Sequence, residues 1–224
     1  MAYFSEDFIR FLRSLMKNNN REWFHAHKRE YETHVKEPFR ALVAELIDRV
    51  SLLHPDVAIE PKDAIFRIAR DIRFSKDKTP YKTFVAAFIS RDGRQQMKHP
   101  GLYIQLGVEG LLVAGGMYQP AREDISRVRR AILEDGATFQ RALRGKRFKD
   151  LFGELQGERN KRLPKEFAAA VARYPFIANK QFYYYAEYDD ARIVLRDDLA
   201  DFLMRHFSAG NKVNDFLKAA ISRR

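Results

Sequence analysis

The residues best suited to chemistry lie in one segment, positions 66 to 83. This segment contains six cations and only two acids. Its arginines alternate with apolar residues, so each planar guanidinium lies beside an apolar body and can bind an oxyanion through two hydrogen bonds. We therefore predict a ligand-binding site for an anion. Its candidate residues are Arg67, Arg70, Arg73, Lys76, Lys78 and Lys82.

Four residues in or near this segment carry groups that transfer protons in enzymes. Asp71, Tyr81 and Lys82 lie within it, and His99 follows it before a Pro-Gly turn. Such side chains act as general acids or bases when they are within hydrogen-bond reach of a substrate. An enzyme acting on a small phosphorylated or carboxylated metabolite is thus the alternative to a binding module. Both alternatives stay open at the level of sequence.

A third alternative is a structural or interaction protein in which the cations of the segment pair internally. The stretch from Glu187 to Asp201 carries six acids and two arginines, and it is a candidate partner for the basic surface. The acids considered for such pairs are Asp189, Asp190, Asp197 and Asp198.

His27, Glu30 and His34 are spaced i, i+3 and i+7, which places three side chains that can ligate metals on one stripe of a helix. The pattern is weak, because exposed helices carry such triples by chance. A metal site also needs a further, distant ligand and supporting hydrogen bonds. We therefore expect no metal here.

Tyr183, Tyr184 and Tyr185 form a run of three aromatic residues in a stretch that reads as a strand. Alternate residues of a strand share a face, so such a run can present rings on which the bases of a nucleic acid stack. A run of this kind is more typical of sheet core with one exposed ring, and we favour that interpretation.

Several enzyme classes lack their usual residues. The chain has no cysteine, which excludes disulfides, thiolate-bound metals and cysteine nucleophiles. It also lacks the nucleophile elbow, the Walker phosphate loop, the dinucleotide glycine motif and the His-Glu-x-x-His helix. We expect no cofactor.

The charge balance favours an anionic partner, because 41 Lys and Arg residues exceed 30 Asp and Glu residues and give a net charge of +11. Nucleic acid is one such partner. No apolar stretch approaches the ~18 residues of a membrane span, and the N-terminus lacks the features of a signal peptide. We expect a cytoplasmic protein with no membrane partner.

The spacing of hydrophobic residues along the chain predicts an α+β fold, in which a mostly antiparallel sheet of about five strands packs with several helices. Tight hairpins are expected at Asp92-Gly93 and at 107–110, because these residues tolerate positive φ. The expected strands, rich in β-branched and aromatic residues, are 65–70, 84–90, 102–106, 111–114 and 182–188.

Helical patterns flank the strands. Ser5 and the asparagines at 18–20 are expected to cap the first two helices, and Pro38 to kink or restart the second. A further helix is expected over 123–143, and Asp197 should cap another before a last, separate helix. Without repeats or linkers, the 224 residues are expected to form a single domain over 1–224.

The longest distinctive stretches resemble one known family, the uncharacterised family catalogued as domain of unknown function 2461. The resemblance covers the first half of the chain well and the second half more loosely. It implies no established activity, substrate or cofactor. The residues that carry it are 18–24 (Asn-Asn-Asn-Arg-Glu-Trp-Phe), 66–83, 99–103 (His-Pro-Gly-Leu-Tyr) and 115–118 (Gly-Gly-Met-Tyr).

Overall fold

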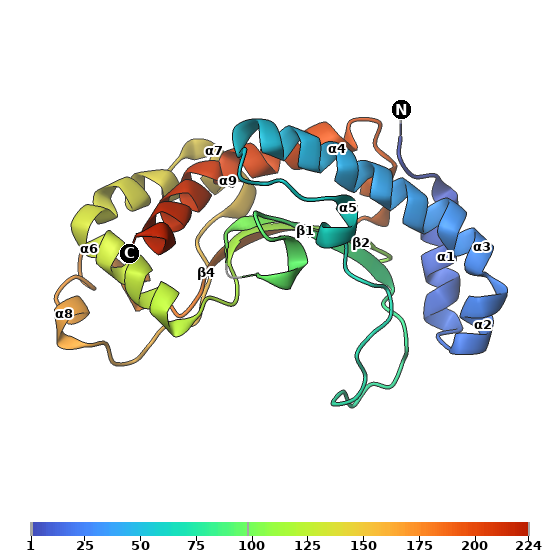
Figure 1. The fold of residues 1–224 in the computed structure, drawn as a ribbon, viewed down its shortest axis with the longest axis horizontal. Coiled ribbons are helices and arrows are strands. Elements are labelled where there is room, and N and C mark those ends of the chain that lie inside the picture. Colours follow the sequence, from blue (N-terminus) through green and yellow to red (C-terminus); the bar gives the residue numbers. More distant parts are fainter. Residues whose placement is uncertain (1, 98, 224) are drawn as a thin grey trace. The chain divides into compact units, whose positions relative to one another are not determined.

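A computed structural model of the chain describes residues 2–97 and 99–223. Its strands form one antiparallel sheet in the order β1-β2-β3-β4, and helices account for much of the remaining chain (Figure 1). The predicted α+β class is therefore confirmed. The strands are β1 (Phe84–Ile89), β2 (Gly101–Gly107), β3 (Gly110–Met117) and β4 (Phe182–Tyr188).

The helices begin largely where the sequence places their caps. The Ser5 side chain accepts a hydrogen bond from the Asp7 amide at 3.3 Å, and Asn20 accepts one from the Trp23 amide at 2.9 Å. The α-helices are α1 (Glu6–Lys17), α2 (Arg21–Ala26), α3 (Lys28–Tyr31), α4 (Glu37–Leu53), α5 (Pro61–Ala64), α6 (Arg122–Leu143), α7 (Lys146–Phe152), α8 (Lys165–Ala168) and α9 (Leu199–Ser222).

Shorter helical turns connect these elements. A π-helix, η1 (Glu32–Lys36), joins α3 to α4, and Pro38, which has no amide hydrogen to donate, lies in the first turn of α4. Three 3₁₀ turns complete the set: η2 (Gly93–Gln95), η3 (Pro175–Ala178) and η4 (Ala191–Leu195).

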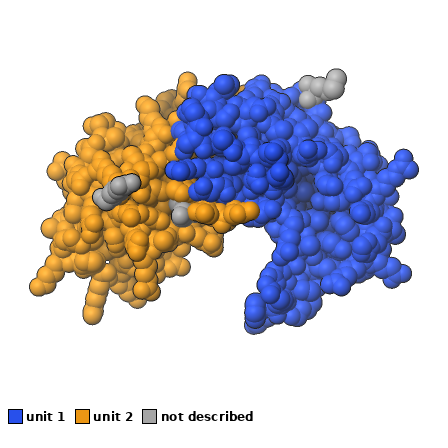
Figure 2. Space-filling view, in the orientation of Figure 1, with its two compact units in different colours: residues 1–94, 103–113, 187–204 blue, residues 95–102, 114–186, 205–224 orange. Residues whose placement is uncertain are grey.

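The chain forms two compact units, coloured separately in Figure 2. Unit 1 contains residues 1–94, 103–113 and 187–204, and unit 2 contains residues 95–102, 114–186 and 205–224. Strands β2, β3 and β4 each contribute residues to both units. The single domain expected over 1–224 stays a prediction.

The core of unit 1 is built from the apolar faces of α1 and α4. Phe8, Leu12 and Leu15 of α1 are completely buried, as are Leu42 and Leu46 of α4. These residues recur at helical spacing, so each helix buries one stripe and leaves its charged residues in solvent.

The core of unit 2 contains a buried polar junction between β3, β4 and α9. The Tyr184 hydroxyl lies 3.1 Å from the Gly210 carbonyl and 3.0 Å from Asn214 Oδ1, both of them acceptors. Asn214 Oδ1 also accepts a hydrogen bond from the Gly116 amide at 3.0 Å. A Cβ on Gly210 would lie 2.1 Å from the Tyr184 hydroxyl oxygen, so only glycine allows this approach.

Two of the expected β elements differ in the structure. Residues 65–70 form only isolated bridges, Ile65 with Ala87 and Ala69 with Tyr81, instead of a continuous strand. Pro80 has no amide hydrogen to donate, which interrupts the pairing on the opposing arm. The tight hairpin at Asp92-Gly93 is also wrong: Gly93 has a φ of +61°, but it begins η2, and β2 starts only at Gly101.

Two other expectations about connections have opposite outcomes. The second hairpin is confirmed, because β2 ends at Gly107 and β3 begins at Gly110. The two helices expected near the C-terminus are a single helix, α9. Gly210 lies inside this helix, where the absence of a Cβ allows α9 to approach Tyr184 closely. Among the helices that the structure describes, none is both long and apolar enough to cross a membrane.

Replacing Tyr184 by Phe should lower the free energy of unfolding by about 1–2 kcal/mol, because Gly210 and Asn214 lose a buried donor. Urea denaturation measures this change. The control is Tyr185→Phe, whose ring is exposed and which should change stability by less than about 0.5 kcal/mol. Equal losses in both variants would show that the buried hydroxyl does not stabilise unit 2.

Candidate functional site

The cationic segment 66–83 projects from the rest of unit 1 as a loop with two arms (Figure 1). Backbone hydrogen bonds join the arms: the Arg70 amide donates to the Pro80 carbonyl at 2.8 Å, and the Lys82 amide donates to the Ile68 carbonyl at 2.9 Å. At the base, the Phe66 amide donates to the Ala86 carbonyl of β1 at 2.9 Å. The arms are therefore held together near the sheet.

The turn between α1 and α2 fixes the returning arm at Tyr81. Asn19 donates from Nδ2 to the Tyr81 carbonyl at 2.9 Å and accepts from the Tyr81 amide at 3.1 Å. The Tyr81 ring stacks on Phe24, with 4.1 Å between ring centroids and an interplanar angle of 18°. Tyr81, a candidate for proton transfer, thus has a structural role in holding the arm.

Two arginines of the segment have partners within the loop itself. Arg73 donates to both carboxylate oxygens of Asp71, at 3.0 and 2.7 Å. Arg70 contacts Asp77 through Nη1 and also bonds Thr79. Both arginines therefore pair with acids of the segment rather than with the acids between 187 and 201.

These pairs keep the two carboxylates ionised. The hydrogen bond from Arg73 lowers the pKa of Asp71 to about 2, and the hydrogen bond from Arg70 likewise lowers the pKa of Asp77 to about 2. A carboxylate with so low a pKa is a poor general base near neutral pH. Asp71 is therefore better suited to orienting Arg73 than to transferring protons.

Lys78 and Lys76 differ in their surroundings. Lys78 Nζ donates to the Ile72 carbonyl at 3.0 Å, which helps to close the end of the loop. Lys76 is exposed, and its side chain makes no hydrogen bond or ion pair with the residues that the structure describes. Phe74, beside them, is 96% exposed, so the outer end of the loop contributes nothing to the core.

Lys82 lies in a different environment, at the base of the loop. Its ammonium nitrogen is 5.5 Å from the centroid of the Phe66 ring and 5.8 Å from that of Phe84. Burial lowers its pKa, and the nearby charges of Arg67 and Arg70 lower it further. Within residues 2–97 and 99–223, no acid forms an ion pair or hydrogen bond with Lys82.

Arg67 completes this group of cations. Its side chain is exposed and makes no hydrogen bond or ion pair in the described part of the chain. Arg70 uses Nη1 for Asp77 and Thr79, so its Nε and Nη2 are available to a ligand. We refer to Arg67, Arg70 and Lys82 as the basal cluster.

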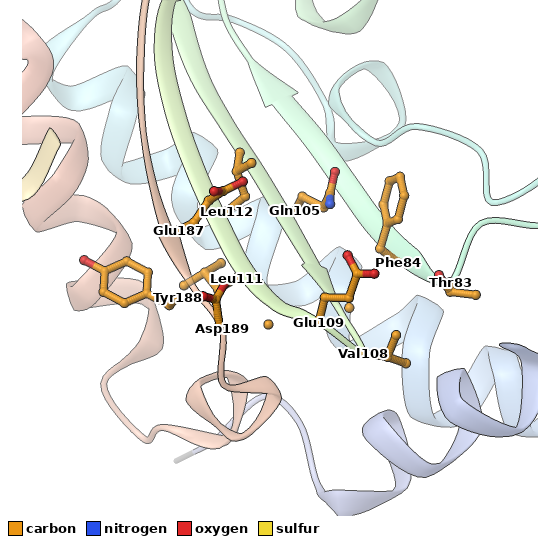
Figure 3. A pocket seen from close by; sticks show the side chains of 12 residues that line it. Thr83, Phe84, Gln105, Val108, Glu109, Leu111, Leu112, Glu187, Tyr188 and Asp189 are labelled. Carbon is orange, nitrogen blue, oxygen red and sulfur yellow. The ribbon is translucent and has the colours of Figure 1, made fainter. Parts of the chain in front are cut away.

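A small pocket of about 90 Å³ adjoins the segment at Thr83 and Phe84 (Figure 3). Its lining includes the carboxylates Glu109, Glu187 and Asp189 from the β2-β3 turn and the end of β4. Negative charge at this position repels phosphates and carboxylates. The pocket therefore gives no support to an enzyme that encloses an anionic metabolite there.

The remaining candidates for proton transfer and metal binding are residues outside the cationic segment. His99 is a half-buried residue of unit 2 just before β2, whereas Asp71, Tyr81 and Lys82 belong to unit 1. His27 stacks on Trp23 at 4.1 Å between centroids and donates from Nδ1 to the Trp23 carbonyl at 2.8 Å.

The helical stripe expected for His27, Glu30 and His34 is broken twice. His27 forms the junction between α2 and α3, and His34 lies in the π-helix η1, whose hydrogen bonds span five residues. His34 Nδ1 lies 3.6 Å from Asp7 Oδ2 instead. The described residues include no group of three or more His, Asp or Glu side chains suited to a metal ion.

The sequence placed Phe66 in the segment as an apolar neighbour of the arginines, but it did not indicate that Asn19 and Phe84 belong to the site. Phe66 and Phe84 provide the rings beneath Lys82, and Asn19 fixes the arm. Lys82 and Phe84 are two residues apart, so period-two alternation was a usable signal. Asn19 gave no such signal, because its bonds reach across 62 positions of sequence.

Replacing Arg67 by Gln should raise the pKa of Lys82 toward its ordinary value of 10.5, because it removes one repelling charge. An NMR titration of the Lys82 side chain measures this pKa. Arg73→Gln is the matched control: it removes the same charge but should leave Lys82 unchanged and raise the pKa of Asp71 from about 2 toward 3.8. Equal shifts of Lys82 in both variants would show that Arg67 is not its specific neighbour.

Comparison with known proteins identifies the family of this chain. No curated protein and no solved structure matches the chain. A family model described as Conserved hypothetical protein (DUF2461) matches residues 7–216, which include most of both units. The chain therefore belongs to this family of conserved hypothetical proteins, DUF2461.

Proposed function

We propose that the protein binds an anionic, phosphate-bearing ligand at the basal cluster of unit 1. The observation that carries the proposal is the environment of Lys82. Its ammonium group is partly buried over Phe66 and Phe84, its pKa is lowered, and the charges that act on it are those of Arg67 and Arg70. A bound anion would offset this repulsion.

The cations of the segment would have different roles in binding. Lys82 and Arg67 would donate directly to phosphate oxygens, and Arg70 would add its free Nε and Nη2. Arg73 and Lys78 already have partners, Asp71 and the Ile72 carbonyl, and would hold the shape of the loop. Lys76 would attract the ligand through its charge without a fixed contact.

Binding receives more support than catalysis from this arrangement. Asp71 is held ionised by Arg73, and Tyr81 is held by Asn19 and Phe24. The pocket beside the segment is lined by carboxylates. The phosphates of a nucleic-acid backbone and of a small molecule share the chemistry that the basal cluster recognises, and both remain within the proposal.

Tripolyphosphate, followed by isothermal titration calorimetry, serves as the probe. Arg67→Gln/Lys82→Gln should raise its Kd at least about tenfold, because two charge-assisted hydrogen bonds are lost. The matched control, Arg73→Gln/Lys78→Gln, removes the same charge from the same segment and should change Kd less than about threefold. Circular dichroism checks that both variants are folded.

The control distinguishes binding at a defined site from attraction by the total charge of the loop. An equal loss in both variants would mean that only the total charge of the loop matters, and would contradict a site at the basal cluster. No binding by the unmodified protein at low salt would also contradict the proposal. Titrations at two ionic strengths add to the comparison, because contacts at a partly buried site are screened less than a surface field.

A further inference from the structure

The net charge of the protein is concentrated in unit 2. Unit 2 carries 21 basic and 9 acidic residues, whereas unit 1 carries 20 basic and 21 acidic residues. The units therefore have formal charges of +12 and −1, which together give the +11 of the chain. The excess of positive charge therefore lies outside the unit that contains the basal cluster, and its field attracts anions to unit 2.

Unit 2 also presents an exposed aromatic surface, formed by Tyr118, Tyr183 and Tyr185. Tyr183 and Tyr185 alternate with the buried Tyr184 on β4 and lie with their rings nearly parallel, 6.3 Å apart and 17° between planes. The Tyr118 ring meets Tyr183 edge to face at 5.1 Å. Tyr118 is 52% exposed and Tyr185 38%, so these two rings are accessible from solvent, whereas Tyr183, which contacts both, is half-buried.

Unpaired cations lie in and after a segment of chain that pairs with β4 at Tyr183. Residues 156–160 form one bridge with β4, Gln156 with Tyr183, and one with the stretch before β4, Arg159 with Asn179. The acid here, Glu158, is bonded to Lys180 at 2.8 Å. Four exposed side chains in and after the segment form no ion pair or hydrogen bond with other described residues: Arg159, Lys161, Arg162 and Lys165.

Exposed rings and unpaired cations together fit one class of ligand. Proteins bind single-stranded nucleic acid by stacking bases on aromatic side chains and tracking the phosphates with cations. A duplex hides the faces of its bases and would leave the tyrosines without a role. An acidic polymer without bases would use the cations alone.

We propose that unit 2 binds single-stranded nucleic acid, with bases stacked on Tyr118, Tyr183 and Tyr185 and phosphates held by the cations at 159–165. This site is separate in sequence and in residues from the basal cluster. Binding at this site does not depend on the base sequence, because every base has a face that can stack.

Fluorescence anisotropy of the full chain with a labelled oligo-dT strand tests the tyrosines. Tyr118→Ala/Tyr185→Ala should raise Kd about ten- to a hundredfold, while affinity for an abasic strand of the same length stays unchanged. Phe74→Ala, which removes an exposed ring from unit 1, is the matched control and should have no effect. Tyr118→Phe/Tyr185→Phe should restore binding, because the rings remain.

A second variant tests the cations. Arg159→Gln/Arg162→Gln should weaken binding of both strands and reduce the slope of log K against log salt by about 1.4, at about 0.7 per phosphate contact. Arg13→Gln/Lys17→Gln, which removes two exposed cations from α1 of unit 1, is the matched control and should leave oligo-dT affinity and its salt slope unchanged. The tripolyphosphate titration tests the basal cluster with its own variants, so either proposal can fail alone.

Three results would overturn the proposal. These are an unchanged oligo-dT affinity in the tyrosine variant, an equal loss for the abasic strand, and tighter binding of a duplex than of the single strand. The second result would make unit 2 a polyanion-binding surface without stacking.

Discussion

Side chains on β4 alternate between a buried and a more exposed face of the sheet, and this alternation places the tyrosines on which the proposal for unit 2 depends. On β4, Tyr184 points into the core of unit 2, where it bonds Gly210 and Asn214. Its neighbours Tyr183 and Tyr185 therefore lie on the opposite face. The buried ring cannot move without breaking the junction with α9, so the exposed rings are held in place as well.

Cations in this protein differ in the groups that surround their charge. Arg129 is only 6% exposed, yet it donates to the carbonyls of Ile177 and Asn179 at 2.9 and 3.1 Å, and its role is structural. Arg73 is satisfied by Asp71. Lys82 is also partly buried but has aromatic rings below it and cations beside it. A ligand that supplies an acceptor stabilises a partly buried charge that otherwise lacks one.

Local signals in the sequence were sufficient for much of the fold. Ser5 and Asn20 cap helices through their own short side chains, and 182–188 forms β4 because its residues favour a strand. The turn at 107–110 was also predictable, since glycines flank it. The strand expected at 65–70 failed because its opposing arm contains Pro80, a partner that only the tertiary pairing reveals.

Residue order alone reveals that six cations lie in one segment, and that three consecutive tyrosines, 183–185, lie in a stretch that favours a strand. Which of those cations are paired depends on the folded loop, in which Asp71 binds Arg73 and Asp77 binds Arg70. The tertiary structure likewise placed the excess charge in unit 2, which is assembled from three separate stretches of chain. Electrostatic energy depends on distances in space, and the order of residues along a chain does not fix those distances.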